Sequence, residues 1–237
     1  MPSRVWTKAE AEYYDTTSAD MFEPAALNPV VDFLFDQARG GPALEFAIGT
    51  GRVALPLSAR GVRVSGIELS PGMAEQLARK PGAESIDVTI GDMATTRVDG
   101  EFSLVYLLWN SLMNVTTQDE QVAVFENAAA HLAPGGRFVI ELLVPNGDHP
   151  FVFSMDPDHA GIDTIDDREG QLSSSLHWMN LDGRFAFNGS QFRYVWPSEI
   201  VLMGRCAGLR LVERWGSWTR TPFTAEPATN SISVFET

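Results

Sequence analysis

Residues 43–144 alternate short apolar runs with helix-compatible stretches, and this alternation constrains the fold more than any other feature. Ser70 followed by Pro71 is typical of a helix cap and first turn. Strands separated by helices predict a parallel sheet with helices on both faces. The expected strands are residues 43–47, 62–69, 86–90, 102–108 and 137–144, and the expected helices between them are 52–60, a helix from Ser70 onward, and 118–132, closed by Pro134-Gly135-Gly136.

The two flanks of this core have other patterns. The first forty residues are expected to be helical, and Gly40-Gly41 ends them. After Pro145, aromatic and turn residues predominate, and Asp182-Gly183 predicts a hairpin turn. The elements expected after Pro145 are hairpin strands at 172–180 and 184–187, a strand at 191–196, a helix at 197–207, and strands at 209–215 and 231–235.

We therefore expect four parts in one α/β chain. They are an N-terminal helical cap at residues 1–40, a ligand-binding core at 41–145, an antiparallel, substrate-covering β insertion at 146–196 after the fifth strand, and a C-terminal helix with the last two strands of the core at 197–237.

Composition and charge limit the function classes. The 237 residues carry a formal net charge of −14, and an acidic surface repels phosphate backbones, so we expect no nucleic-acid partner. The single cysteine, Cys206, excludes an intramolecular disulfide and a Cys-rich zinc site, and its apolar surroundings predict a buried thiol. No long apolar stretch predicts a signal peptide or a membrane span, so we expect a cytoplasmic location.

The glycine-rich turn after the first strand is the first candidate binding element. Its sequence is Glu45-Phe46-Ala47-Ile48-Gly49-Thr50-Gly51. The two glycines allow positive φ and leave room for a ligand at the carboxyl end of a parallel strand, where ligands bind in open sheets. The spacing of Gly49, Gly51 and Ala54 also suits a dinucleotide, so this turn alone does not choose the ligand.

Two acidic residues at the ends of later strands narrow the ligand. Glu68 ends the second strand, where a carboxylate can accept hydrogen bonds from both ribose hydroxyls of a nucleoside. Asp92 follows the third strand and can accept from an adenine amino group, while Met93 packs on the ring. A solvated strand-end acid is the alternative for Glu68.

With these residues, the sequence resembles the class I S-adenosylmethionine-dependent methyltransferases. The resemblance covers residues 40–145. It rests on the glycine turn, on residues 66–73, on residues 91–93 and on residues 132–136, in the family's order and spacing. It implies a Rossmann-like, seven-stranded sheet whose last strand is antiparallel, and S-adenosyl-L-methionine as the cofactor.

The resemblance also implies roles for individual residues. Glu45 would reach the methionine portion of the cofactor, Glu68 the ribose, and Asp92 with Met93 the adenine. The complete set of expected cofactor-binding residues is Glu45, Ala47, Gly49, Gly51, Glu68, Leu69, Met73, Asp92, Met93 and Leu108.

Two positions depart from the family pattern. Ala47 stands where glycine is usual, and its methyl group is expected to fit if the residue keeps a negative φ. Ser103 stands where the family often has Asp, and we expect a structural role there.

Methyl transfer from a sulfonium requires alignment and exclusion of water more than a particular catalytic residue type. Trp109, Asn110, Ser111 and Asn114 follow the fourth strand and are expected on the methyl-transfer side. Asn110 is the first polar candidate for catalysis there, with helix capping as its alternative. Tyr14, in the N-terminal segment, is a second catalytic candidate that would close the site, or else a packing residue.

The third catalytic candidate is a histidine. His177 lies mid-hairpin and is the first choice for a base or an acceptor contact, whereas His131 is expected to be structural. His149 and His159 flank the insertion, and the histidines show no metal-ligand spacing, so no metal is expected.

Alternation in the insertion places Phe192, Tyr194 and Trp196 on one face, with Arg193 pointing the other way. Packed against a helix, the aromatic face would be core; over a cleft it would line an apolar pocket. The insertion is loosely similar to that of amino-sugar N-methyltransferases, and residues 192–197 resemble a run in unassigned actinobacterial proteins.

The sequence thus predicts a methyltransferase that acts on N or O of a small-molecule acceptor. An NAD-dependent oxidoreductase and a non-catalytic S-adenosylmethionine-binding protein are the alternatives. Membrane association is not expected, and a homodimer is left open.

Overall fold

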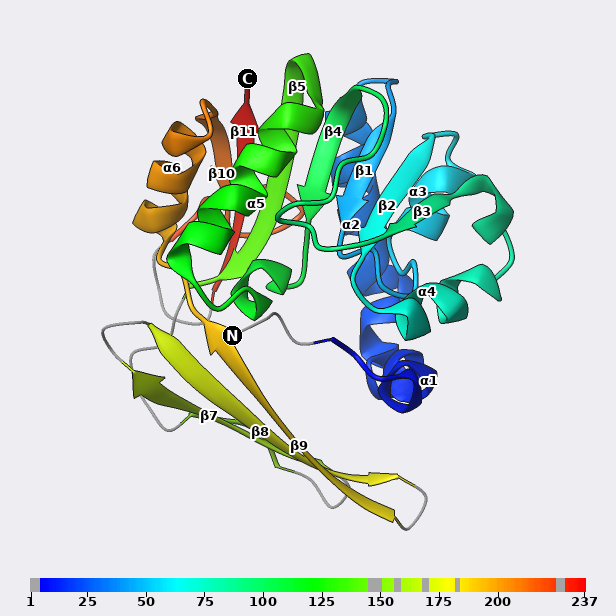
Figure 1. Ribbon diagram of the computed structural model, residues 1–237, viewed down its shortest axis with the longest axis vertical. Coiled ribbons are helices and arrows are strands. Elements are labelled where there is room, and N and C mark those ends of the chain that lie inside the picture. The colour runs from blue at the N-terminus through cyan, green and yellow to red at the C-terminus, as the bar shows by residue number, and fades with distance from the viewer. Residues whose placement is uncertain (1–4, 145–150, 156–158, 168–170, 182–183, 225–228) are drawn as a thin grey trace.

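A computed structural model of the protein describes residues 5–144, 151–155, 159–167, 171–181, 184–224 and 229–237. It contains a seven-stranded sheet with helices on both faces and a four-stranded antiparallel sheet that extends away from it (Figure 1). The helices are α1 (Lys8–Thr17), α2 (Pro24–Ala38), α3 (Ala54–Ala59), α4 (Pro71–Ala78), α5 (Gln118–His131) and α6 (Pro197–Cys206), with 3-10 turns η1 (Ala19–Phe22), η2 (Ala83–Ser85) and η3 (Ser111–Asn114).

The large sheet has the order β10-β11-β5-β4-β1-β2-β3. β11 is antiparallel to both neighbours, and the pairs among β1 to β5 are parallel. The chain leaves β1 toward β2 and β3 on one side and toward β4 and β5 on the other, so the order reverses between β1 and β4. Its strands are β1 (Ala43–Phe46), β2 (Val64–Glu68), β3 (Asp87–Ile90), β4 (Phe102–Leu107), β5 (Leu132–Leu143), β10 (Arg210–Trp215) and β11 (Asn230–Glu236).

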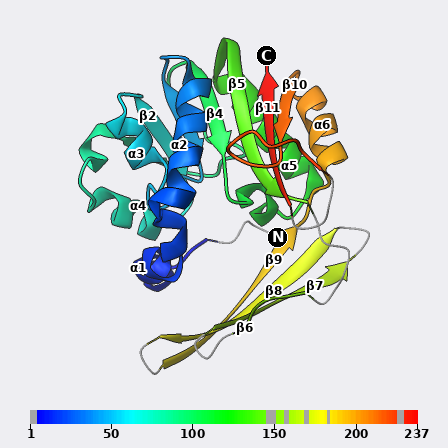
Figure 2. The same cartoon turned by 180° about the vertical axis from the view of Figure 1, so that it is seen from behind.

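The core forms two apolar clusters, one on each face of this sheet. Leu104 and Tyr106 of β4 pack with α2 and α3, whereas Val105 and Leu107 pack with α5 and α6. Because the strand is buried on both faces, it reads as a continuous apolar run. Figure 2 shows the sheet from behind, with α2 and α3 on the near face. The predicted α/β fold, including the antiparallel last strand, is confirmed.

The insertion forms the second sheet, in the order β6-β7-β8-β9. The hairpin strands pair from Leu181 opposite Arg184 to Leu172 opposite Arg193; the predicted turn residues 182–183 lie outside the described residues. The strands are β6 (Phe151–Met155), β7 (His159–Asp167), β8 (Leu172–Leu181) and β9 (Arg184–Arg193).

Some predicted boundaries were wrong. The prediction of a separate strand at 191–196 fails because β9 runs unbroken through Asn188-Gly189 and ends at Arg193. β5 begins at Leu132 rather than at residue 137, and α3 begins at Ala54 rather than at residue 52.

Two predictions of burial were also wrong. Cys206 is exposed; it is the last residue of α6, beyond Ile200 and Met203, which pack in the core. The aromatic face of residues 192–196 is not core either: Arg193 and Val195 are buried, whereas Trp196 is 41% exposed. Arg193 points away from the aromatic residues, as predicted, but the side it points to is the protein interior.

Arg193 is the centre of a buried polar network that joins the insertion to the core. Its guanidinium donates to Gln121 Oε1 at 2.5 Å, to Gln171 Oε1 at 3.2 Å and to Glu199 Oε1 at 2.6 Å. Gln121 Nε2 in turn donates to the carbonyl oxygens of Leu112 and Val115. The network therefore connects β9, α5 and α6 with η3, beside the site described below.

We expect Arg193→Met to lower the free energy of unfolding by about 3–5 kcal/mol, because the Glu199 carboxylate loses its buried cation. The double variant Arg193→Met/Glu199→Leu should lose less, since it leaves no unpaired charge. Chemical denaturation measures both. Lys8→Met, which removes an exposed ion pair with Glu75, is the control and should cost less than about 1 kcal/mol. Equal losses in the single and double variants would contradict the pairing.

Candidate functional site

The glycine turn that follows β1 is built from left-handed residues. Ala47, Gly49 and Gly51 have φ of 53°, 59° and 78°. Ala47 therefore does not keep the negative φ that was the condition under which its methyl group was expected to fit. A left-handed conformation costs a non-glycine residue about 1–2 kcal/mol, and Ala47 adopts it where the chain turns sharply from β1 across the carboxyl end of the sheet.

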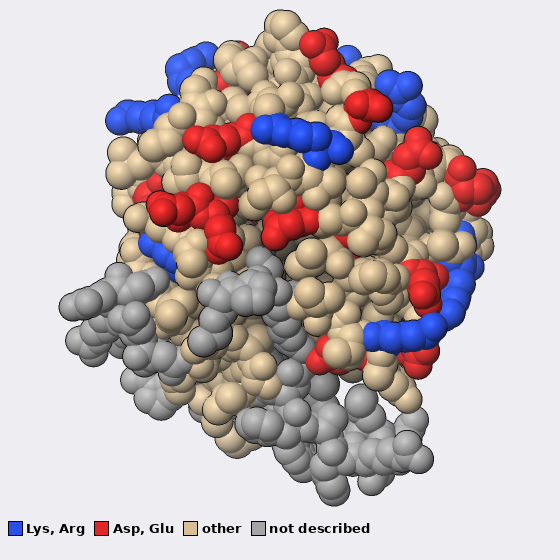
Figure 3. Space-filling model, viewed as in Figure 1, with Lys and Arg blue, Asp and Glu red and all other residues tan. Residues whose placement is uncertain are grey.

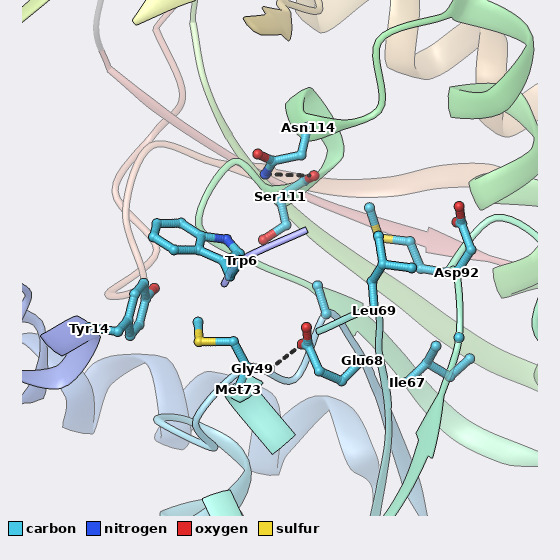
Figure 4. Close-up of a pocket in the computed structure, with 13 residues that line it drawn as sticks. Trp6, Tyr14, Gly49, Ile67, Glu68, Leu69, Met73, Asp92, Ser111 and Asn114 are labelled. Atoms are coloured by element: carbon cyan, nitrogen blue, oxygen red, sulfur yellow. Dashed lines mark hydrogen bonds between the residues drawn. The ribbon is translucent and has the colours of Figure 1, made fainter. Parts of the chain in front are cut away.

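A cavity lies beside this turn, at the carboxyl ends of β1, β2 and β3 (Figure 4). Most of its lining belongs to the predicted set: Tyr14, Ala47, Gly49, Glu68, Leu69, Met73, Asp92 and Met93, with Ser111 and Asn114 from the predicted methyl-transfer side. Trp6, Ile67 and Gly91 also line it and were not in that set. Glu45, Gly51, Leu108 and Asn110 are not among the lining residues.

Glu68 joins the glycine turn to the next helix. Its Oε2 accepts from the Gly49 backbone N–H at 2.7 Å (Figure 4). Its Oε1 accepts from the Ser70 N–H at 2.8 Å. Ser70 also caps α4, because its hydroxyl accepts from the Met73 N–H at 3.2 Å. Burial raises the pKa of Glu68, and these backbone hydrogen bonds oppose the rise. Each oxygen retains a second lone pair that can accept from a ligand hydroxyl.

Asp92 also lines the cavity and lies after β3, the strand that pairs with β2. Its Oδ1 accepts from the Ala94 N–H at 2.8 Å, which fixes the turn. The Met93 side chain is buried, and Asn127 Nδ2 holds the Met93 carbonyl at 2.7 Å. Gly91 is required next to them, because a Cβ there would lie 2.1 Å from Thr96 Oγ1.

Glu45 lies at the end of β1, beside the cavity. One carboxylate oxygen accepts from the Tyr106 hydroxyl at 2.9 Å. Burial raises the pKa of Glu45 to about 8, against the opposing effects of the Tyr106 hydrogen bond and the charge of Arg52. Arg52, directly after the glycine turn, is a residue that sequence reasoning missed; only the fold brings its charge close to Tyr14, Glu45 and Glu141.

The turn after β4 has an unusual backbone. Trp109 and Asn110 are both left-handed, with φ of 55° and 57°. Glu141 Oε2 accepts from the Trp109 N–H at 3.0 Å, and Asn110 Oδ1 accepts from the Leu143 N–H at 2.7 Å. Asn110 stands at the N-cap position of η3 but makes no side-chain cap bond. Its amide oxygen therefore holds the turn against β5.

The N-terminal segment covers the cavity. Trp6 and Tyr14 contact each other edge to face, with ring centroids 5.3 Å apart, and both line the cavity. Thr50 Oγ1 donates to Asp15 Oδ1 at 2.6 Å, and Asp15 also pairs with Lys80. These contacts hold α1 directly against the glycine turn. Burial raises the pKa of Tyr14, with the charge of Arg52 opposing.

The histidines divide as follows. His131 is buried, and its ring nitrogens meet the Asn127 carbonyl at 2.7 Å and the Val98 N–H at 3.0 Å, which is a structural role. His177 lies in β8 opposite Gly161 and Asn188, but its side chain is outside the described residues, as is that of His159 in β7. His149 lies wholly outside them.

Ser103 confirms the structural role expected for it: its hydroxyl donates toward the carbonyl oxygens of Ala38 and Pro42. Within the described part of the chain, no group of three or more His, Cys, Asp or Glu side chains could hold a metal ion. No helix among the described residues is long and apolar enough to cross a membrane.

This strand order, with the cavity over the carboxyl ends of β1 to β3, defines a Rossmann-like nucleoside-binding protein. Residues 43–136 match the family model described as "Methyltransferase domain". The solved structure of the CcbJ methyltransferase from Streptomyces caelestis is 30% identical in sequence, with a TM-score of 0.84 over 95% of this chain and 94% of that one.

A second relative extends along nearly the whole chain. The cypemycin N-terminal methyltransferase from a Streptomyces species is 26% identical over 229 residues, which is 93% of each chain. The structure of SAM-bound CalS10, an amino pentose methyltransferase from Micromonospora echinaspora, shares the fold, with a TM-score of 0.70 at 20% identity over 99% of each chain. The chain belongs to the class I S-adenosylmethionine-dependent methyltransferase family, and S-adenosyl-L-methionine is its cofactor.

Proposed function

We propose that the protein transfers a methyl group from S-adenosyl-L-methionine to an amine nitrogen of a small molecule. The observation that carries this proposal is the similarity to the cypemycin N-terminal methyltransferase, which spans 93% of each chain. The described residues that line the cofactor cavity include the carboxylates of Glu68 and Asp92 but no histidine or lysine, and burial raises the pKa of Tyr14 above its ordinary value. A neutral amine attacks through its lone pair and loses its proton afterwards, whereas a hydroxyl acceptor needs a base during attack.

The comparison with the cypemycin N-terminal methyltransferase supports the same acceptor atom, because the similarity spans 93% of both chains. The family membership removes an NAD-dependent oxidoreductase from consideration, and the named relatives are enzymes rather than non-catalytic binding proteins. The bound cofactor supplies an activated methyl group on a sulfonium. The protein would align the acceptor with it and exclude water.

For the cofactor we propose the contacts that the family resemblance implies. Glu68 would accept from the ribose hydroxyls, Asp92 from the adenine amino group, and Met93 with Leu69 and Met73 would pack around the nucleoside. Ala47, Gly49, Gly51 and Leu108 would give backbone contacts, and Glu45 would receive the positively charged methionine portion.

For the acceptor we propose the four-part division of the chain, with residues 146–196 covering the substrate. Tyr14 would close the site, and His177 stays the candidate for a base or an acceptor contact. Asn110 is a weaker catalytic candidate, because its amide oxygen accepts from Leu143. On the face shown in Figure 3, acidic and basic side chains of the described residues are interspersed, which fits the proposal of no nucleic-acid partner. We also propose a cytoplasmic location, and a homodimer is left open.

The test of the proposed function is a turnover screen with matched acceptors. We expect mass spectrometry to detect a methylated product from primary or secondary amines and none from hydroxyl analogues of the same size. The rate should rise with pH until the amine is neutral. Turnover of phenols or sugars, but not of amines, would overturn the proposal.

Glu68→Gln should weaken binding of S-adenosylhomocysteine by about 1–3 kcal/mol, because a charged acceptor to the ribose is lost. Calorimetric titration measures this. Glu101→Gln is the control, since Glu101 is an exposed acid at the opposite end of the sheet. An unchanged affinity in Glu68→Gln would remove the role proposed for that carboxylate.

Cofactor binding should depend on pH through Glu45. In the free protein its pKa of about 8 keeps the side chain neutral near pH 7. A cationic ligand favours the carboxylate, so binding releases a proton and affinity increases with pH, by up to about tenfold per unit. Titrations between about pH 6 and 7.5 should show this slope, and Glu45→Gln should flatten it. A slope that persists in the variant would contradict the assignment.

A further inference from the structure

Trp109 is a large aromatic residue that the fold holds exposed at the active end of the sheet. It follows the carboxyl end of β4, and its side chain is 47% exposed. The Arg52 guanidinium lies over its ring, 5.6 Å from the centroid. Two residues later, Ser111 lines the cofactor cavity. The indole therefore stands next to both the glycine turn and η3, on the side of the cavity away from Asp92.

The backbone that carries this indole is strained. Trp109 and Asn110 are consecutive non-glycine residues in the left-handed region. Such residues cost about 1–3 kcal/mol each and persist where the surroundings determine them, most often at functional sites. Two strained residues in succession therefore indicate that the surroundings of this turn fix its backbone.

A buried carboxylate holds the strained turn in place. Glu141 Oε2 accepts from the Trp109 N–H, and Glu141 Oε1 accepts from the Trp218 indole N–H at 3.0 Å. Trp218 is anchored in turn on Phe33, edge to face, with centroids 5.4 Å apart. Burial raises the pKa of Glu141, so this carboxyl group is an unfavourable one to place inside the protein. In the described part of the chain its hydrogen bonds go to these two tryptophans, which indicates a positioning role.

The position of Trp109 relative to the nucleoside contacts identifies what it faces. Glu68 and Asp92 lie at the ends of β2 and β3, and the proposed cofactor extends from them across β1. β4 is the next strand, so Trp109 lies beyond the methyl-bearing end. An exposed indole at that place offers an apolar, electron-rich face, which suits the carbon skeleton and the positive charge of a methylated amine.

We propose that Trp109 is an acceptor-contact residue whose indole forms one wall of the acceptor site, and that Glu141 is the residue that positions it. That the acceptor is an amine rests on the proposed function. The contact between Trp109 and the acceptor does not depend on it.

The first test follows the indole directly. In protein labelled with ¹⁵N-tryptophan and saturated with S-adenosylhomocysteine, the Trp109 Nε1–H signal is assigned by its loss in Trp109→Phe. We expect it to shift when an acceptor from the turnover screen is added. If only phenols or sugars shift it, the contact stands and the amine proposal fails. If no member of the panel shifts it, the contact is overturned.

The second test separates positioning from folding. Glu141→Ala should raise the acceptor KM about tenfold or more, with S-adenosylhomocysteine affinity within about twofold, because only the acceptor wall moves. Glu141→Gln keeps one acceptor oxygen for the Trp109 N–H and should restore most of the loss. Trp218→Phe removes the other bond of Glu141 and should have a smaller effect than Glu141→Ala. Equal losses of cofactor affinity and acceptor KM in Glu141→Ala, or an unchanged KM in Trp109→Ala, would overturn the assignment.

Discussion

The Glu68 carboxylate accepts hydrogen bonds from the backbone N–H groups of Gly49 and Ser70. The geometry of the site depends on this carboxylate. The first bond fixes the glycine turn after β1, and the second fixes the start of α4 after β2. The carboxylate therefore adds a side-chain link between the two segments to the backbone hydrogen bond from the Ile48 N–H to the Ile67 carbonyl. The same carboxylate is oriented toward the cavity, and the group that shapes the site is therefore also the group best placed to bind a ligand there.

The same device recurs around the edge of the sheet. Asp92 holds its own turn through the Ala94 N–H, and Glu141 holds the turn after β4 through the Trp109 N–H. A carboxylate is the side chain suited to this task, because it accepts several hydrogen bonds and donates none when ionised. The cost is burial of acidic groups, which is evident in the raised pKa values of Glu45, Glu68 and Glu141. A cationic cofactor would offset part of that cost when it binds.

The sequence predicted the centre of the sheet well, because the central strands β1 and β4 are buried on both faces and are therefore mostly apolar. It predicted most of the residues that line the cavity for a related reason: they lie at or directly after the ends of strands that the topology brings to one edge. Periodicity failed where it identifies two faces without saying which is buried. The alternation correctly placed Arg193 and the neighbouring aromatic residues on opposite faces of the strand. The face that carries Arg193 is nevertheless the buried one, because Gln121 of α5 and Glu199 of α6 accept hydrogen bonds from its guanidinium.

The two ends of the site differ in how far apart in the sequence their residues lie. Each nucleoside contact is local: a short segment contains both the strand end and the side chain that would touch the ligand. The proposed acceptor wall is not local, because the orientation of Trp109 depends on Glu141 from β5, on Trp218 from the segment between β10 and β11, and on Arg52 from the glycine turn. No spacing in the sequence encodes such an arrangement. Short sequence patterns therefore predict which donor binds. Acceptor specificity depends on tertiary contacts, which relatives with the same patterns need not share.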